Sequence, residues 1–104
     1  MATIYAYWGS NQIAQRRLVK IGYTAQDLGA YLRNLERAFD PILLATRPGG
    51  RHEEKMEHAK WHVHLAEGRE WFYPVPNLLD YLRREWRVTP TFEELAATIL
   101  RNIP

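Results

Sequence analysis

The chain contains no cysteine among its 104 residues. A disulfide framework, a thiolate nucleophile and a cysteine metal ligand are therefore excluded. No apolar run approaches the roughly 20 residues that a membrane-spanning helix needs, and the N-terminus lacks the basic-then-apolar order of a signal peptide. These absences predict a cytoplasmic protein without a membrane partner.

The sequence also lacks internal repeats, low-complexity segments and an internal linker. Its apolar content of 46% and charged content of 25% are those of an ordinary globular protein. A chain of this length buries roughly two-thirds of its unfolded surface in a single core. We expect one domain over residues 1–104, with a core over about residues 3–82 and a C-terminal helical extension over about residues 83–104.

The net charge is only +2, but eleven of the fourteen cationic residues are arginines. Arginine makes forked contacts with phosphate groups. Two interpretations stay open: a solvated arginine-rich surface, or a broken basic face that binds nucleic acid.

Period-two runs of β-branched and aromatic residues predict strands at residues 3–8 and 18–23, joined as a hairpin with a long loop. A short apolar run predicts a third strand at residues 42–46. Thr24 or Asp27 is expected to cap a helix with Leu28, Leu32, Leu35 and Phe39 on its inner face.

Three further helices are expected after the third strand. The first runs from about residue 51 to 65, with Met56 and Val63 near its inner side. The next is capped by Asn77 and runs to about residue 86. The last begins after Thr91, which forms a capping box with Glu94.

Four segments of the chain form an ordered pattern. They are Thr3-Ile4-Tyr5-Ala6-Tyr7, Val19-Lys20-Ile21-Gly22-Tyr23-Thr24, the pair Glu54 and His58 followed by Trp61, and Gly68-Arg69-Glu70-Trp71-Phe72. This order and spacing resemble the GIY-YIG nuclease superfamily, especially small phage and bacterial members with K-I-G in place of Y-I-G. The resemblance covers roughly residues 3–82. It implies an α+β fold with a small three-stranded antiparallel sheet, in the order β-β-α-β-α-α-α.

The resemblance implies hydrolysis of DNA phosphodiester bonds with one Mg²⁺ or Mn²⁺ ion. Tyr5 would activate the attacking water through a pKa lowered from about 10, and Lys20 would be its electrostatic partner. Glu54 would bind the metal, and His58, one helical turn later, would be an accessory group. Taken alone, these residues equally fit a packed tyrosine, a lysine protecting a strand edge and a surface glutamate.

The family helix after the second motif carries an arginine that contacts the scissile phosphate. Aligning the leucines places Tyr31 at that position. Arg16 or Arg17, on the hairpin loop, would have to replace the missing cation and contact the nucleic acid. Loss of such a cation typically slows catalysis by two to three decades, a cost of about 3–4 kcal/mol.

Three further interpretations stay open, two of the function of the domain and one of its histidines. The domain would be a DNA-binding module that has lost hydrolysis, or a protein-interaction domain that presents aromatic residues such as Trp8 and Trp86. His58 and His62, with His64 nearby, form the third alternative, a structural zinc site, although neither H-E-x-x-H nor a two-cysteine pattern is present.

Overall fold

The computed structural model describes residues 2–11 and 16–101, without the side chains at positions 11 and 36–39. The predicted strands and the first predicted helix are present within it, at slightly different lengths. In chain order the elements are β1 (Thr3–Asn11), β2 (Arg16–Thr24), α1 (Leu28–Phe39), β3 (Ile42–Pro48), α2 (Arg51–Lys60), the 3₁₀ turn η1 (His62–His64), β4 (Leu65–Glu67), β5 (Trp71–Phe72), α3 (Pro76–Glu85), β6 (Arg87–Val88) and α4 (Phe92–Arg101).

The α+β class is confirmed, but the predicted three-stranded sheet is wrong. The described strands form one six-stranded antiparallel sheet in the order β4-β5-β2-β1-β3-β6. The three additional strands are only two or three residues long. Such segments are too short to show the alternation that predicts a strand. Strands β5 and β6 pair with the edges of the longer strands β2 and β3, and β4 pairs with β5.

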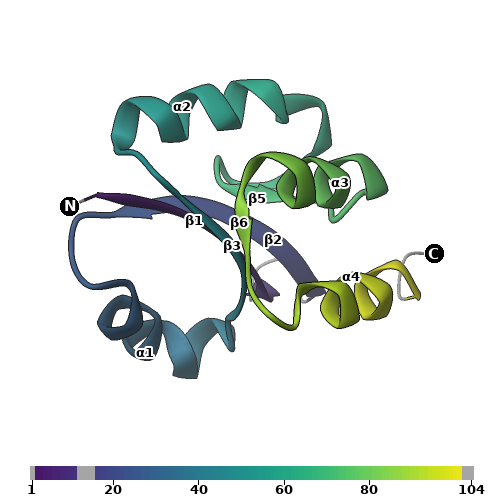
Figure 1. The fold of residues 1–104 in the computed structure, drawn as a ribbon, viewed down its shortest axis with the longest axis horizontal. Helices are drawn as coiled ribbons and strands as arrows, with labels where there is room; N and C mark the ends of the chain where they lie inside the picture. The colour runs from purple at the N-terminus through teal and green to yellow at the C-terminus, as the bar shows by residue number, and fades with distance from the viewer. Residues whose placement is uncertain (1, 12–15, 102–104) are drawn as a thin grey trace.

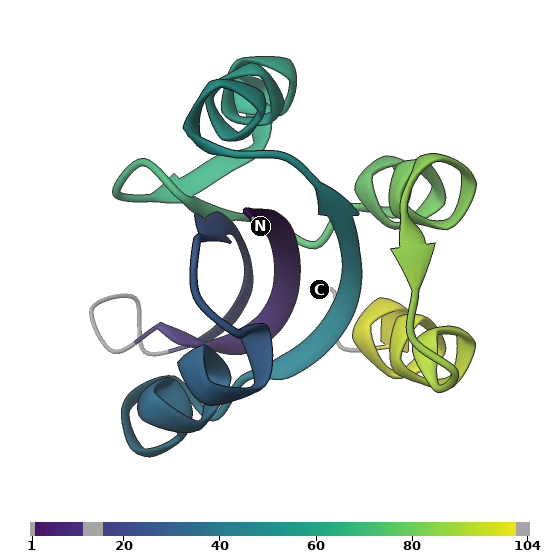
Figure 2. The same cartoon turned by 60° about the vertical axis from the view of Figure 1, so that its left-hand side comes forward.

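The sheet separates two clusters of buried side chains, and helices cover both (Figure 1). Figure 2 shows α1 on one side of the curved sheet, with α2, α3 and α4 spread around the other. Because side chains alternate along a strand, Tyr5 and Tyr7 face α1, while Ile4, Ala6 and Trp8 face the larger cluster.

Helix α1 forms as predicted. The Asp27 carboxylate accepts a hydrogen bond of 2.9 Å from the backbone N–H of Ala30, which makes Asp27 the cap. Leu28, Leu32 and Leu35 pack against the tyrosine side of the sheet. The helix ends before Asp40, whose φ of 44° leaves the helical region. The side chain of Phe39 lies outside the described residues.

Helix α2 is shorter than predicted, and its inner face is different. It ends at Lys60, and the expected last turn is replaced by η1 and β4. Met56 and Val63, predicted to point inward, are 60% and 84% exposed. The buried side carries Glu57 instead, which an apolar periodicity cannot predict.

Some of the predictions for the C-terminal half are confirmed and others are wrong. Helix α3 begins two residues early, with Pro76 at its first position and Val75 as the cap in place of Asn77, because proline is preorganised for a helix start. Helix α4 begins directly after Thr91, as predicted. Trp86 is buried, and so is Trp8 on β1, so neither of these two residues is the surface aromatic that was proposed for a protein-interaction domain. In the described part of the chain no helix is long and apolar enough to cross a bilayer.

Candidate functional site

Tyr5 lies in a cluster of three tyrosines between the sheet and α1. Its ring stacks parallel to Tyr7 at 5.6 Å, and its hydroxyl donates a hydrogen bond of 2.7 Å to the hydroxyl of Tyr31. Tyr31 is the residue that the leucine alignment places where an arginine was expected from the resemblance. Helix α1 therefore delivers a phenol, not a guanidinium, to the hydroxyl of Tyr5.

The environment of Tyr5 opposes ionisation. Its side chain is only 1% exposed, and this burial, followed by the hydrogen bond with Tyr31, raises the pKa of Tyr5 far above its usual value of 10. The resemblance implied a lowered pKa, so this expectation is wrong. At neutral pH Tyr5 is a phenol that donates a hydrogen bond and not a phenolate that abstracts a proton.

Lys20 lies on the same face of the sheet, directly across from Tyr7 in the register of β1 and β2. Its ammonium is 3.4 Å from the carboxylate of Glu70, and the Lys20 side chain is only 13% exposed. The ammonium also lies about 6 Å from the rings of Tyr7 and Trp71, at 6.0 and 5.9 Å. The Lys20 ammonium is therefore fixed by an ion pair beside two aromatic rings. It is not a solvent-exposed lysine that protects a strand edge.

Strand β5 pairs with β2 only at Val19 and Lys20. Beyond these residues, the side chains of Glu54 and His58 on α2 form hydrogen bonds with the backbone of β2. The N–H of Ile21 bonds to the carbonyl of Glu70 at 3.0 Å, and the carbonyl of Ile21 bonds to Nε2 of His58 at 2.7 Å. Two residues later on the same edge, the backbone of Tyr23 hydrogen-bonds to the carboxylate of Glu54.

The residue spacing along α2 and β2 explains why Glu54 and His58 both reach the backbone of β2. Four residues of a helix advance about 6 Å, and two residues of a strand advance about 6.8 Å. Because a carbonyl only accepts hydrogen bonds, Nε2 of His58 carries a proton. His58 thus has a structural role on the sheet edge, which the E-x-x-x-H spacing does not reveal.

Glu54 is nonetheless a perturbed carboxylate. Burial, with a further contribution from the negative charge of Glu70, raises its pKa, although His58, Tyr23 and Arg51 favour the charged form. The charge of Glu70 also raises the pKa of Tyr5 and Tyr7. Glu70 is therefore the shared neighbour of the hairpin tyrosines, the lysine and the α2 carboxylate.

Arg16 and Arg17 do not join this group. They begin β2, at the far end of the hairpin, roughly 17–20 Å along the strand from Gly22. Arg17 contacts Asp40 at 3.0 Å and lies 4.2 Å from the ring centre of Trp8, and Arg16 bonds to the hydroxyl of Tyr73 at 2.8 Å. Neither is available at the position of the family arginine.

Residues 2–11 and 16–101 contain no group of three histidine, aspartate or glutamate side chains placed to surround a metal ion. His58 and His62 border a hollow of about 290 Å³ together with Leu65 and Arg69. A guanidinium beside two imidazoles disfavours a cation there, so the hollow gives zinc no support. A metal at the β2 edge would have Glu54 and Glu70 as protein ligands and would take the rest from water or substrate.

Glu70 lies in the fourth motif, Gly68-Arg69-Glu70-Trp71-Phe72, and no role was predicted for it from the sequence. Trp71 and Phe72 are buried, but Glu70 precedes them at the point where β5 meets β2. The available signal was a carboxylate directly before an aromatic pair in the fourth motif. Comparisons of the chain with family models, with curated proteins and with solved structures found no match.

Proposed function

We propose that this protein is a metal-dependent endonuclease of the GIY-YIG type that hydrolyses phosphodiester bonds of DNA. The observation that carries the proposal is the grouping around Glu70. Its charge acts on Glu54 and on Tyr5, and its carboxylate pairs with Lys20. Glu70 thus links a second carboxylate, an ammonium and a pair of hydroxyl groups, and perturbed ionisable groups of this kind are more typical of a functional site than of a structural core.

The donor set fits a hard divalent cation. The charge of Glu70 raises the pKa of Glu54, and a Mg²⁺ or Mn²⁺ ion between the two carboxylates would relieve this repulsion. Such ions keep several bound waters and also bind phosphate oxygens. Glu54 and Glu70 would hold the ion. Once bound, it would polarise the scissile phosphate and stabilise the leaving oxygen.

The other residues act on substrate and water. Lys20 offsets the negative charge of a phosphate oxygen. The hydroxyl oxygen of Tyr31 accepts a hydrogen bond from Tyr5. The hydroxyl hydrogen of Tyr31 is therefore free to be donated to another group. The hydroxyl pair therefore orients a water or a phosphate oxygen rather than removing a proton.

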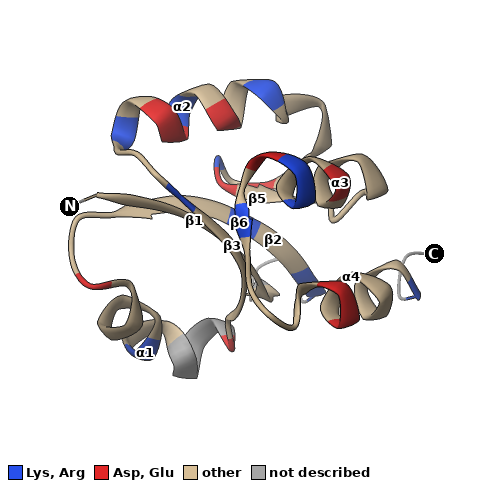
Figure 3. Ribbon diagram, viewed as in Figure 1, with Lys and Arg blue, Asp and Glu red and all other residues tan. Residues whose placement is uncertain are grey.

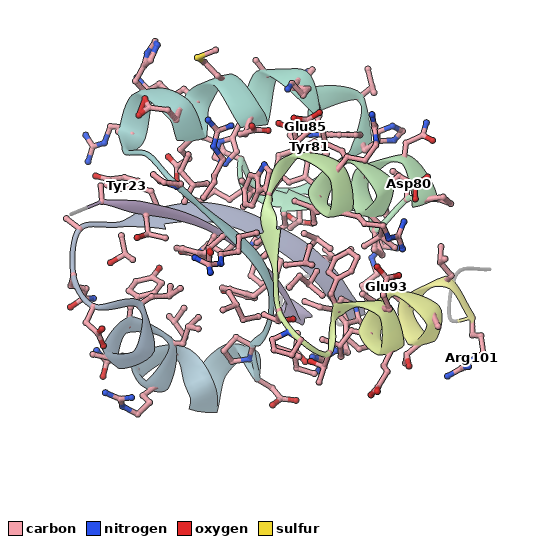
Figure 4. All side chains as sticks on the ribbon, in the orientation of Figure 1. Tyr23, Asp80, Tyr81, Glu85, Glu93 and Arg101 are labelled. Atoms are coloured by element: carbon pink, nitrogen blue, oxygen red, sulfur yellow. The ribbon has the colours of Figure 1, made fainter. Side chains whose placement is uncertain are left out.

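Cleavage of supercoiled plasmid in Mg²⁺ or Mn²⁺ tests the proposal. We expect the wild type to nick the plasmid, with the activity abolished by EDTA and by Glu54→Gln. Glu85→Gln, a change of the same type on the exposed surface of α3 (Figure 4), is the control and should cleave normally. Equal cleavage by the wild type and Glu54→Gln at matched purity would refute the proposal.

A second candidate is a DNA-binding domain without hydrolysis, favoured by the Tyr5–Tyr31 hydrogen bond at the arginine position. It predicts binding that weakens steeply with salt, because phosphate contacts release counterions. Figure 3 shows cations distributed over several elements, and many of them are paired with acids. A protein that binds DNA with this salt dependence, but cleaves no faster than Glu54→Gln, would favour this candidate.

A further inference from the structure

A second concave site lies away from the β2 edge, between α3 and the end of α2. It is a cavity of about 560 Å³, a size that suits a small organic ligand or one nucleotide. Figure 4 labels two of its wall residues, Asp80 and Tyr81, on α3. The lining consists of Trp61, Asn77, Asp80, Tyr81, Arg83 and Arg84.

Two aromatic rings form one wall of this cavity. The centres of the Trp61 and Tyr81 rings are 5.3 Å apart, and the rings are tilted by 56°. The hydroxyl of Tyr81 donates to Glu57 at 2.6 Å and accepts from the Lys60 ammonium at 3.0 Å. These bonds hold the Tyr81 phenol in a fixed position on this wall.

The two arginines of the cavity differ in their pairing. Arg83 bonds to both carboxylate oxygens of Glu93, at 2.7 and 2.8 Å, and also contacts Asp80. Arg84 is exposed and has no ion pair or hydrogen bond with the described part of the chain. Arg84 therefore keeps its full donor fork for an anion from solution.

We propose that this cavity binds one unstacked nucleotide of a single strand, with the base against Trp61 and Tyr81 and a phosphate on Arg84. Aromatic faces accept any base by stacking, and a guanidinium binds phosphate through two parallel hydrogen bonds. A rim amide from Asn77 adds a donor and an acceptor for a base edge.

The placement links this site to the proposed function, on which the inference rests. Trp61 is the residue directly after α2 and follows Glu54 by seven residues, so it lies about two helical turns, roughly 10 Å, from Glu54. A strand cut beside Glu54 would thus place a neighbouring nucleotide at Trp61. The cavity would hold unpaired DNA next to the scissile bond.

The test is fluorescence anisotropy of a labelled oligothymidylate in EDTA, where no cleavage occurs. We expect Trp61→Leu to weaken binding about tenfold, and Trp61→Phe, which keeps a ring, to weaken it much less. Arg84→Ala should weaken binding and lower the salt slope by about one. Arg33→Ala, the same charge change on the exposed surface of α1, is the control and should bind as the wild type does.

Two further measurements make the test decisive. Quenching of tryptophan fluorescence by the oligonucleotide should be reduced in Trp61→Phe, a change that a purely structural role of Trp61 would not produce. Thymidine monophosphate should compete only weakly, since a strand adds neighbouring phosphate contacts. Competition by the mononucleotide equal to that of the strand, or Arg84→Ala binding as tightly as Arg33→Ala, would overturn the inference.

The outcome is separable from that of the nuclease proposal. If Arg84→Ala and Trp61→Leu bind the oligonucleotide as tightly as the wild type does, and cleavage still depends on Glu54, the proposed nucleotide site is refuted and the nuclease proposal is not. Binding that depends on the cavity, without any cleavage, supports the cavity and refutes the nuclease.

Discussion

A Cβ atom on Gly22 would lie 2.5 Å from the hydroxyl oxygen of Tyr5, its cross-strand partner, and 2.8 Å from the ring carbon that bears it. The Tyr5 ring thus lies directly over Gly22 and occupies the space of a side chain. Since this ring is packed between the sheet and α1, it has no room to move away. The glycine of the second motif is required by packing whether or not the site is catalytic.

Gly22→Ala should therefore lower the free energy of unfolding by about 2 kcal/mol, the cost of overpacking a core. Urea denaturation measures this loss. Gly50→Ser is the matched control, because its Cβ meets only Ala2 at 3.7 Å and serine is a favoured residue before a helix. Equal stability of Gly22→Ala and the wild type would show that the ring is not fixed in this position.

Removal of the hydroxyl groups of Tyr5 and Tyr7 should have opposite effects. The Tyr5 hydroxyl bonds to Tyr31, whereas the Tyr7 hydroxyl is buried without a hydrogen-bond partner among the described residues. Tyr5→Phe should destabilise the fold by about 1 kcal/mol, and Tyr7→Phe should stabilise it by up to about 1 kcal/mol. Thermal unfolding of the two variants measures the signs, and equal losses would contradict the difference in bonding.

The ion pair of Arg47 and Glu57 should contribute more to stability than the surface pairs. Glu57 is 2% exposed and lies 2.9 Å from the guanidinium of Arg47. Arg47→Ala leaves this carboxylate buried with only the hydroxyl of Tyr81 and should cost about 2 kcal/mol, less than for a fully buried pair because Arg47 is partly exposed. Glu93→Gln, which breaks an exposed pair with Arg83, should leave the unfolding midpoint unchanged. A similar midpoint for both variants would contradict the prediction.

Because the pKa of Glu54 is raised, we expect Glu54→Gln to increase the free energy of unfolding by an amount that depends on pH. A carboxyl group whose pKa is higher in the folded state holds its proton more tightly there, so it stabilises the fold below its unfolded pKa. That contribution is lost as the pH rises. At neutral pH, Glu54→Gln should therefore be slightly more stable than the wild type, by less than about 1 kcal/mol after solvent screening.

The gain should disappear below about pH 4, where Glu54 is protonated in both states. Urea titrations at several pH values, with Glu85→Gln as control, measure it. A loss of stability at neutral pH would mean that the edge hydrogen bond of Glu54 outweighs the cost of its burial. A gain retained in acid would show that its charge is not the cause.

The long elements of this fold were predictable because each one carries its own pattern. Alternation identified β1 and β2, and the leucine stripe identified α1. Strands β5 and β6 have no pattern of their own, and each pairs with two residues of a longer strand. The inner face of α2 escaped prediction because a buried glutamate, and not an apolar residue, faces the neighbouring helix.

The candidate site was predictable as a set of residues but not as a set of contacts. The motifs identified Tyr5, Lys20, Glu54 and His58, and the leucine alignment singled out Tyr31. Sequence spacing could not reveal that Tyr31 accepts a hydrogen bond from Tyr5, or that Glu70 pairs with Lys20. Both contacts join residues far apart in the chain, and they depend on strand register.

The closure of the β2 edge by a side chain has a consequence for detecting ligands. The Glu54 carboxylate accepts a hydrogen bond from the Tyr23 backbone and cannot turn fully toward a cation without releasing that amide. Deuterium uptake at this single amide would then rise when the carboxylate is recruited elsewhere and stay slow when it is not. Cation binding at this edge can thus be followed without any measurement of cleavage.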